Sequence, residues 1–118
     1  AAVCACISET QRINIKNNAE IRGKQLYDGI LKLKKKSDVI GDVRGGQGLM
    51  AAIEVVSDQK KKTAINMDAM KKIHQKTYEA GAMVRLSLNN ILMSPPLVIS
   101  EAEIDQILDA LDYGFSSM

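Results

Sequence analysis

The chain has 118 residues, of which 46% are hydrophobic and 25% charged, with a formal net charge of +2. This length predicts a single domain, and so small a net charge gives no support for a nucleic-acid or membrane partner. No segment reaches the roughly 18–20 consecutive apolar residues that cross a bilayer, and no signal-peptide pattern opens the chain, so we expect a soluble, cytoplasmic protein.

The chain begins at Ala1 inside a helix-like run that has no capping residue before it, which indicates a fragment of a longer protein. Cys4 and Cys6 lie in this run, and at a spacing of two on a helix they do not face each other. Together with His74, the only histidine, they cannot complete a structural zinc site. We therefore expect two buried, free thiols in a reducing compartment, and no metal site.

Residues 1–36 are predicted to be helical, as one long helix or as two helices separated by a break. One apolar stripe recurs at steps of four, three, four and three, and its members are Ala19, Gly23, Leu26, Ile30 and Leu33. Because glycine weakens a helix, Gly23 is predicted to serve close packing against another part of the chain. The lysines of residues 32–36 are interpreted as a solvated helix end, where cations favour the helix dipole, rather than as a phosphate site.

Residues 39–48 are predicted to form a glycine-rich connection, which leads into an apolar strand at 49–56 and an exposed turn at 57–63. The glycines run into a strand rather than a helix, so they do not form a nucleotide-binding loop. Gly45-Gly46-Gln47 matches the tripeptide with which peptide-chain release factors hydrolyse peptidyl-tRNA. The C-terminus is acidic and apolar, whereas those factors use a basic tail, so we interpret the glycines as a turn with positive φ angles.

Asn66 is placed to cap a helix that extends to Ala80 and ends at Gly81. The inner face of this helix is expected to hold Met67, Met70, Ile73 and Thr77. Two short strands are predicted at 83–86 and 90–93, and the second cannot continue through Pro95-Pro96 because proline donates no ladder hydrogen bond.

The last helix is predicted by a capping box, with Ser100 at the N-cap and Glu103 at the third helical position. Its apolar stripe consists of Ile104, Ile107, Leu108, Leu111 and Phe115. The order helix, strand, helix, strand pair, helix predicts an α+β fold, with a small, largely antiparallel sheet and helices packed on one face.

Two polar residues are candidates for chemistry. His74 lies in mid-helix among lysines, with no carboxylate nearby in the sequence, which is typical of a surface or boundary residue rather than a general base. Arg85 lies in an apolar stretch, where a buried guanidinium is costly without an anion. It is therefore either an edge-strand arginine that pairs with a carboxylate of this chain, or a residue that binds a carboxylate ligand in bidentate fashion.

Two motifs in the right order give the chain a specific resemblance. The segments 42–54, 81–85 and 91–99 resemble the C-terminal small domain of class III pyridoxal-phosphate-dependent aminotransferases, and most closely the omega-amino-acid:pyruvate transaminases. Relatives of the ornithine and 4-aminobutyrate type place an arginine where this chain has Met93. Two departures are Asn89-Asn90, where many relatives have Gly-Asp, and a glycine turn at 45–48 that is one residue longer than the common version.

The resemblance implies a fold of the fold-type I pyridoxal 5′-phosphate (PLP) transferases and a site shared with a large domain that precedes this chain. The lysine that binds PLP covalently and the other cofactor-binding residues would lie on that large domain, so no catalytic, cofactor-binding or metal residue is expected here. Arg85 would be the substrate-binding arginine, which swings in to bind the substrate carboxylate and out to admit an uncharged group. Asp42 and Arg44 match positions with a structural role.

We therefore expect residues 1–118 to be one domain, the C-terminal part of a larger and usually dimeric aminotransferase. Residues 1–36 would be a helical lead-in, and residues 37–118 a sandwich of sheet and helices. The enzyme would use PLP to transfer an amino group from an amine or omega-amino acid to a keto acid such as pyruvate, and this chain alone would be inactive. The alternative is a free-standing α+β module that binds a small acid without catalysis, and the third hypothesis is translation release through Gln47.

Overall fold

Helices alternate along the chain with the strands of one antiparallel sheet in the computed structural model, which describes all residues from 1 to 118. The elements are α1 (Ala2–Arg12), α2 (Ile15–Lys36), β1 (Ile40–Arg44), β2 (Ala51–Asp58), β3 (Thr63–Ala64), α3 (Met67–Glu79), β4 (Arg85–Ser87), β5 (Asn90–Met93) and α4 (Glu101–Ser116). The sheet has the order β1-β2-β5-β4, with β3 paired to β2, and every pairing is antiparallel. The predicted α+β class is confirmed.

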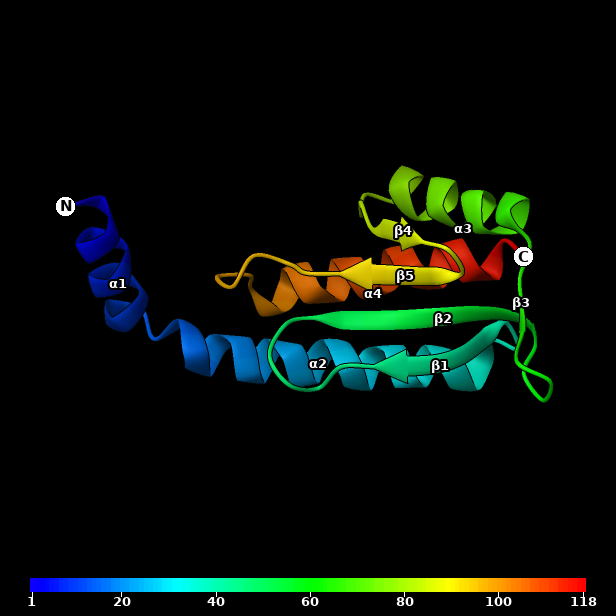
Figure 1. The fold of residues 1–118 in the computed structure, drawn as a ribbon, viewed down its shortest axis with the longest axis horizontal. Helices are drawn as coiled ribbons and strands as arrows, with labels where there is room; N and C mark the ends of the chain where they lie inside the picture. Colours follow the sequence, from blue (N-terminus) through cyan, green and yellow to red (C-terminus); the bar gives the residue numbers. More distant parts are fainter.

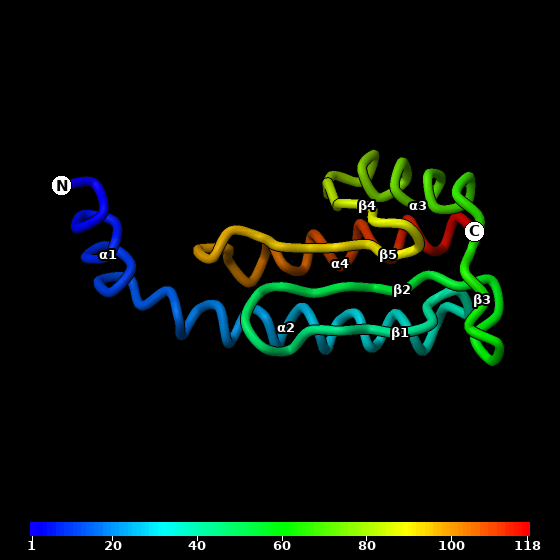
Figure 2. Tube along the Cα trace, in the orientation of Figure 1, coloured from blue at the N-terminus to red at the C-terminus, as the bar shows by residue number.

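The N-terminal helical region is two helices with a break, one of the two forms predicted. The break lies at Asn14, whose φ of 49° is left-handed and interrupts the helix. α1 buries no residue, and it extends away from the rest of the molecule (Figures 1 and 2). The expectation of buried thiols was therefore wrong: Cys4 and Cys6 are free but exposed, because nothing in this chain packs on α1. None of the helices combines the length and apolar character needed to span a bilayer.

The stripe predicted for α2 is confirmed, since its five residues are the buried residues of that helix. α2 packs against β1, β2 and α4. A Cβ atom added to Gly23 would lie 1.8 Å from the backbone oxygen of Gly48, so a glycine is required where α2 meets the loop between β1 and β2. The positive φ angles predicted for this loop are also present, at Gly45, Gly46 and Gly48.

β1 corrects the prediction of a continuous glycine-rich connection at 39–48. Gly41 lies inside this strand, at a shift of register between Ile40 and Asp42 opposite β2. A Cβ atom at residue 41 would lie 2.6 Å from the Val56 side chain, so the glycine accommodates a bulge and a close neighbour rather than a turn. The strand was missed because Gly41-Asp42 has the composition of a turn.

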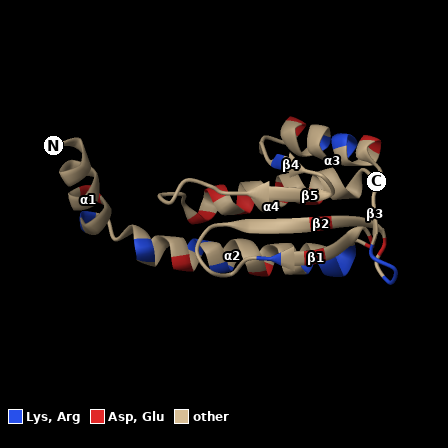
Figure 3. Ribbon diagram, viewed as in Figure 1, with Lys and Arg blue, Asp and Glu red and all other residues tan.

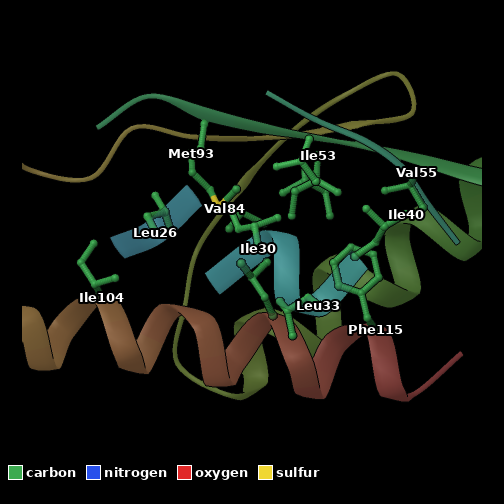
Figure 4. Packing of buried hydrophobic residues seen from close by; sticks show 14 of the residues in the cluster. Leu26, Ile30, Leu33, Ile40, Ile53, Val55, Val84, Met93, Ile104 and Phe115 are labelled. Atoms are coloured by element: carbon green, nitrogen blue, oxygen red, sulfur yellow. The ribbon is translucent and has the colours of Figure 1, made fainter. Parts of the chain in front are cut away.

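One face of the sheet carries the core. The buried residues that alternate along β2 and β5 are Ala51, Ile53, Val55, Ile91 and Met93. They face Leu26, Ile30 and Leu33 of α2 and, beyond that helix, Ile104 and Phe115 of α4 (Figure 4). The opposite face of β2 and β5 has no helix packed on it, and its residues there are only half-buried.

α3 packs on α4, and Met70, Ile73 and Thr77 are buried as predicted. Met67 is 48% exposed, so the prediction that it faces inward was wrong; it is the first residue of the helix. The Asn66 side chain accepts a hydrogen bond from the Ala69 amide, which confirms the predicted cap. The capping box of α4 is also present, and its hydrogen bonds from the Ser100 amide and hydroxyl lower the pKa of Glu103.

A strained residue connects β4 to β5. Leu88 has a φ of 54°, although it is neither glycine nor asparagine, and its side chain is 79% exposed. A left-handed conformation costs a residue with a Cβ atom about 1–2 kcal/mol, whereas asparagine tolerates it better. We expect Leu88→Asn to raise the melting temperature by about 2–4 °C, as measured by circular dichroism. Leu97→Asn, at another exposed leucine without a positive φ, should give no such gain; an equal rise in both variants would contradict the assignment to strain.

Candidate functional site

Arg85 is the first residue of β4, which forms the outer edge of the sheet. Its side chain is exposed, and it forms no hydrogen bond or ion pair with any other residue. Of the two alternatives for this arginine, the edge-strand position is present, but the apolar neighbours along the sequence do not cover the side chain, since Met83 is 83% exposed. Arg85 also forms no ion pair with a carboxylate of this chain.

The other arginines of the chain all have partners. Arg12 bonds to Glu9, and Arg22 contacts Glu101 across α2 and α4. Arg44 lies 3.2 Å from an Asp42 carboxylate oxygen. Partial burial raises the pKa of Asp42, but the hydrogen bonds from Arg44 and the Val43 amide and the charge of Lys34 leave it below its ordinary value. Arg85 thus differs from the rest in having a guanidinium free to bind an external anion.

Three surface depressions meet at Arg85. One, with a volume of about 470 Å³, lies between the residues 81–85 and the turn Ser94-Pro95-Pro96. A second lies on the open face of the sheet and includes Arg44 and Met50. The third lies toward α3 and includes His74 and Tyr78. Arg85 and the double-proline turn therefore line the same depression.

Strand pairing places Arg85 at the end of a row across the sheet. Arg85 is opposite Leu92, Leu92 is opposite Ala52, and Ala52 is opposite Arg44. The two guanidinium-bearing residues thus lie on the face without helices and are separated by apolar residues. Figure 3 shows β5 without charged residues beside β4, whose first residue is basic. Such a surface can bind an anion and an apolar group side by side.

His74 has a contact that sequence analysis did not identify. Its Nε2 atom lies 3.0 Å from the backbone oxygen of Val84, the residue before Arg85. The ring is half-buried, in agreement with a surface or boundary residue. No pattern in the sequence marks this pair, because it depends on where α3 sits relative to the edge of the sheet.

The residues present do not form a covalent PLP site. Of the 12 lysines, only Lys34 and Lys76 are half-buried, and the others are exposed. No lysine lines any of the three depressions at Arg85. Around Arg85 the chain therefore provides an unpaired guanidinium and apolar walls, and no lysine that could bind a cofactor covalently.

The architecture matches that of solved transaminases. An amine transaminase from an uncultivated Pseudomonas species, solved with PLP bound, superposes with a TM-score of 0.92 and 30% sequence identity over 98% of this chain. The match covers 26% of the longer chain. The fold, together with an edge-strand arginine beside a double-proline turn, thus defines a domain of the transaminase type.

The chain belongs to the class-III aminotransferase family, whose sequence model matches residues 1–113. It is 32% identical over its whole length to the taurine–pyruvate aminotransferase of Bilophila wadsworthia, of which it covers 27%. It is also 34% identical to the leucine/methionine racemase of Thermococcus litoralis, over 99% of this chain and 26% of that protein. The chain thus spans about a quarter of the length of these relatives.

Proposed function

We propose that this chain is the C-terminal domain of a PLP-dependent class III aminotransferase, which transfers an amino group from an amine or omega-amino acid to a keto acid such as pyruvate. Membership of the family supports amino transfer, and the similarity to a taurine–pyruvate aminotransferase supports a pyruvate-type acceptor. The observation that carries the role of this chain is the free, exposed guanidinium of Arg85, where three depressions meet.

Arg85 binds the carboxylate of an amino acid or keto acid through two parallel N–H donors, the geometry in which guanidinium recognises carboxylate. Because Arg85 has no partner within the chain, no internal ion pair has to break when the substrate binds. With a substrate that lacks a carboxylate, the side chain turns toward solvent. Met83 and Leu92 then provide apolar contact for the uncharged group.

The proposal also covers the parts of the enzyme that lie outside this chain. The large domain of the full-length protein supplies the lysine and the other residues that hold PLP, which serves as the electron sink in amine chemistry. The enzyme acts in the cytoplasm as a homodimer.

The first test is the activity of the full-length gene product, purified from its source cells. We expect a protein several-fold larger than 12.9 kDa that converts pyruvate to alanine with a primary amine as donor. The 118-residue chain, purified free of host enzymes, is expected to have no such activity, because none of its lysines lies at the Arg85 site. Mass spectrometry of the native protein and a coupled alanine assay measure both.

Three results would contradict the proposal. A native product of 12.9 kDa would favour the free-standing acid-binding module. Activity of the isolated chain would show that the site is complete in these residues. Conversion of one amino-acid enantiomer into the other without any keto acid would instead assign the reaction of the racemase relative. The requirement for an acceptor therefore separates amino transfer from racemisation.

A further inference from the structure

α3 is connected to the backbone of the site by the hydrogen bond between His74 Nε2 and the Val84 oxygen, 3.0 Å apart. A carbonyl oxygen only accepts, so Nε2 carries the proton in this contact. Ile73 and Thr77, on either side of His74, are fully buried, and Thr77 also accepts a hydrogen bond from the Ala82 amide. The segment that leads into β4 is thus fixed to α3 at two points.

The oxygen that His74 holds belongs to the same peptide group as the amide of Arg85. A peptide group is planar and rigid, so restraining the Val84 oxygen restrains the orientation of the bond that enters Arg85. Pairing between β4 and β5 begins only at Arg85, and β4 is an edge strand with no neighbour on its outer side. His74 therefore restrains the backbone at a position where no neighbouring strand does so.

We propose that His74 is a positioning residue for Arg85. By holding the Val84–Arg85 peptide, it fixes the Cα atom of Arg85. The guanidinium then reaches a carboxylate by rotation of the side chain alone. Bidentate recognition depends strongly on orientation, and a freer backbone would lower the affinity for carboxylates. This inference rests on the proposed function of Arg85; it assigns His74 no contact with substrate.

The test uses the full-length enzyme and compares two donors in single-turnover half-reactions: alanine, which has a carboxylate, and 1-phenylethylamine, which has none. His74→Ala is expected to raise the saturation constant for alanine by about 3–10-fold, the effect of losing one hydrogen bond. The constant and the maximal rate for 1-phenylethylamine should stay within about twofold. The inhibition constant of propanoate against 1-phenylethylamine should rise in parallel with the alanine constant, which reports carboxylate binding without turnover.

Two further substitutions separate positioning from folding. His74→Gln should recover most of the alanine affinity, because the glutamine Nε2 donor lies the same number of bonds from Cα as the histidine Nε2. His74→Phe keeps a ring in place but has no donor, and should behave like His74→Ala. Lys72→Ala is the matched control, since Lys72 is exposed on the same helix and lines none of the three depressions at Arg85.

The inference is overturned if His74→Ala and His74→Phe bind alanine and propanoate like the wild type, if both donors are impaired equally, or if glutamine restores nothing. Failure of the proposed function looks different. In that case Arg85→Ala itself leaves the alanine and propanoate constants unchanged. A large effect of Arg85→Ala with none of His74→Phe rejects only the positioning role.

Discussion

Arg85→Ala in the full-length enzyme is expected to raise the saturation constant for alanine by about 10²-fold, while the constant for an uncharged amine donor stays nearly the same. The reason is that Arg85 is the only arginine of the chain without an acidic or amide partner, so its donors are available to a substrate carboxylate. Two charge-assisted hydrogen bonds together contribute about 3 kcal/mol, which corresponds to a factor of about 10² in binding. Single-turnover kinetics with both donors measure this difference.

Two further substitutions test whether the effect depends on positive charge alone and whether it depends on the position of the arginine. Arg85→Lys keeps the charge but loses the planar pair of donors, so it should give an intermediate loss. Arg44→Ala removes the arginine at the other end of the same cross-strand row, which is already paired with Asp42, and should change the alanine constant by less than about threefold. If Arg44→Ala were as damaging as Arg85→Ala, the site would depend on the overall charge of this face. If Arg85→Ala impaired the amine donor equally, carboxylate binding would not be its role.

Local patterns predicted those parts of the fold that local physics determines. The stripe of α2 and the capping box of α4 follow from a helical period and from a short-range hydrogen-bond pattern, and both are present. β1 was missed because Gly41 has the composition of a turn, although here it accommodates a bulge beside Val56. The exposure of Cys4 and Cys6 was missed because an apolar helix is expected to be covered, and within this chain α1 is not.

The candidate site, like the fold, could be predicted from the sequence only in part. Arg85 was identified as a single charge among apolar residues, and its proximity to the double-proline turn follows from the pairing of β4 with β5. The sequence left open whether its guanidinium pairs within the chain, because that depends on which carboxylates the fold brings near β4, and it brings none. The hydrogen bond between His74 and Val84 could not be predicted from the sequence either. It depends on how α3 packs on α4, and that packing is set by the contacts of Ile73 and Thr77 with side chains far along the chain.

Gly23→Ala is expected to destabilise the 118-residue chain by about 2 kcal/mol, despite the better helix propensity of alanine. The added Cβ atom would lie 1.8 Å from the Gly48 oxygen and 2.5 Å from the Gly48 carbonyl carbon, so the backbone of the β1–β2 loop or of α2 must move. Overpacking typically costs about 1–3 kcal/mol and more where backbone has to shift, whereas alanine gains only about 1 kcal/mol over glycine in a helix. Urea unfolding followed by circular dichroism measures the difference.

Gly29→Ala, on the same helix, is the matched control. There the nearest atoms are the methyl groups of the Leu108 side chain, at 2.3 and 2.6 Å, and this half-buried leucine can change rotamer where a backbone carbonyl cannot. The clash is then largely relieved, and the gain in helix propensity keeps the net change within about 1 kcal/mol of zero. Equal losses in both variants would mean that α2 tolerates no added volume on either side. A neutral Gly23→Ala would mean that the β1–β2 loop is not held against α2, and the close approach at Gly48 would then have no part in fixing β2, the strand that pairs with β5.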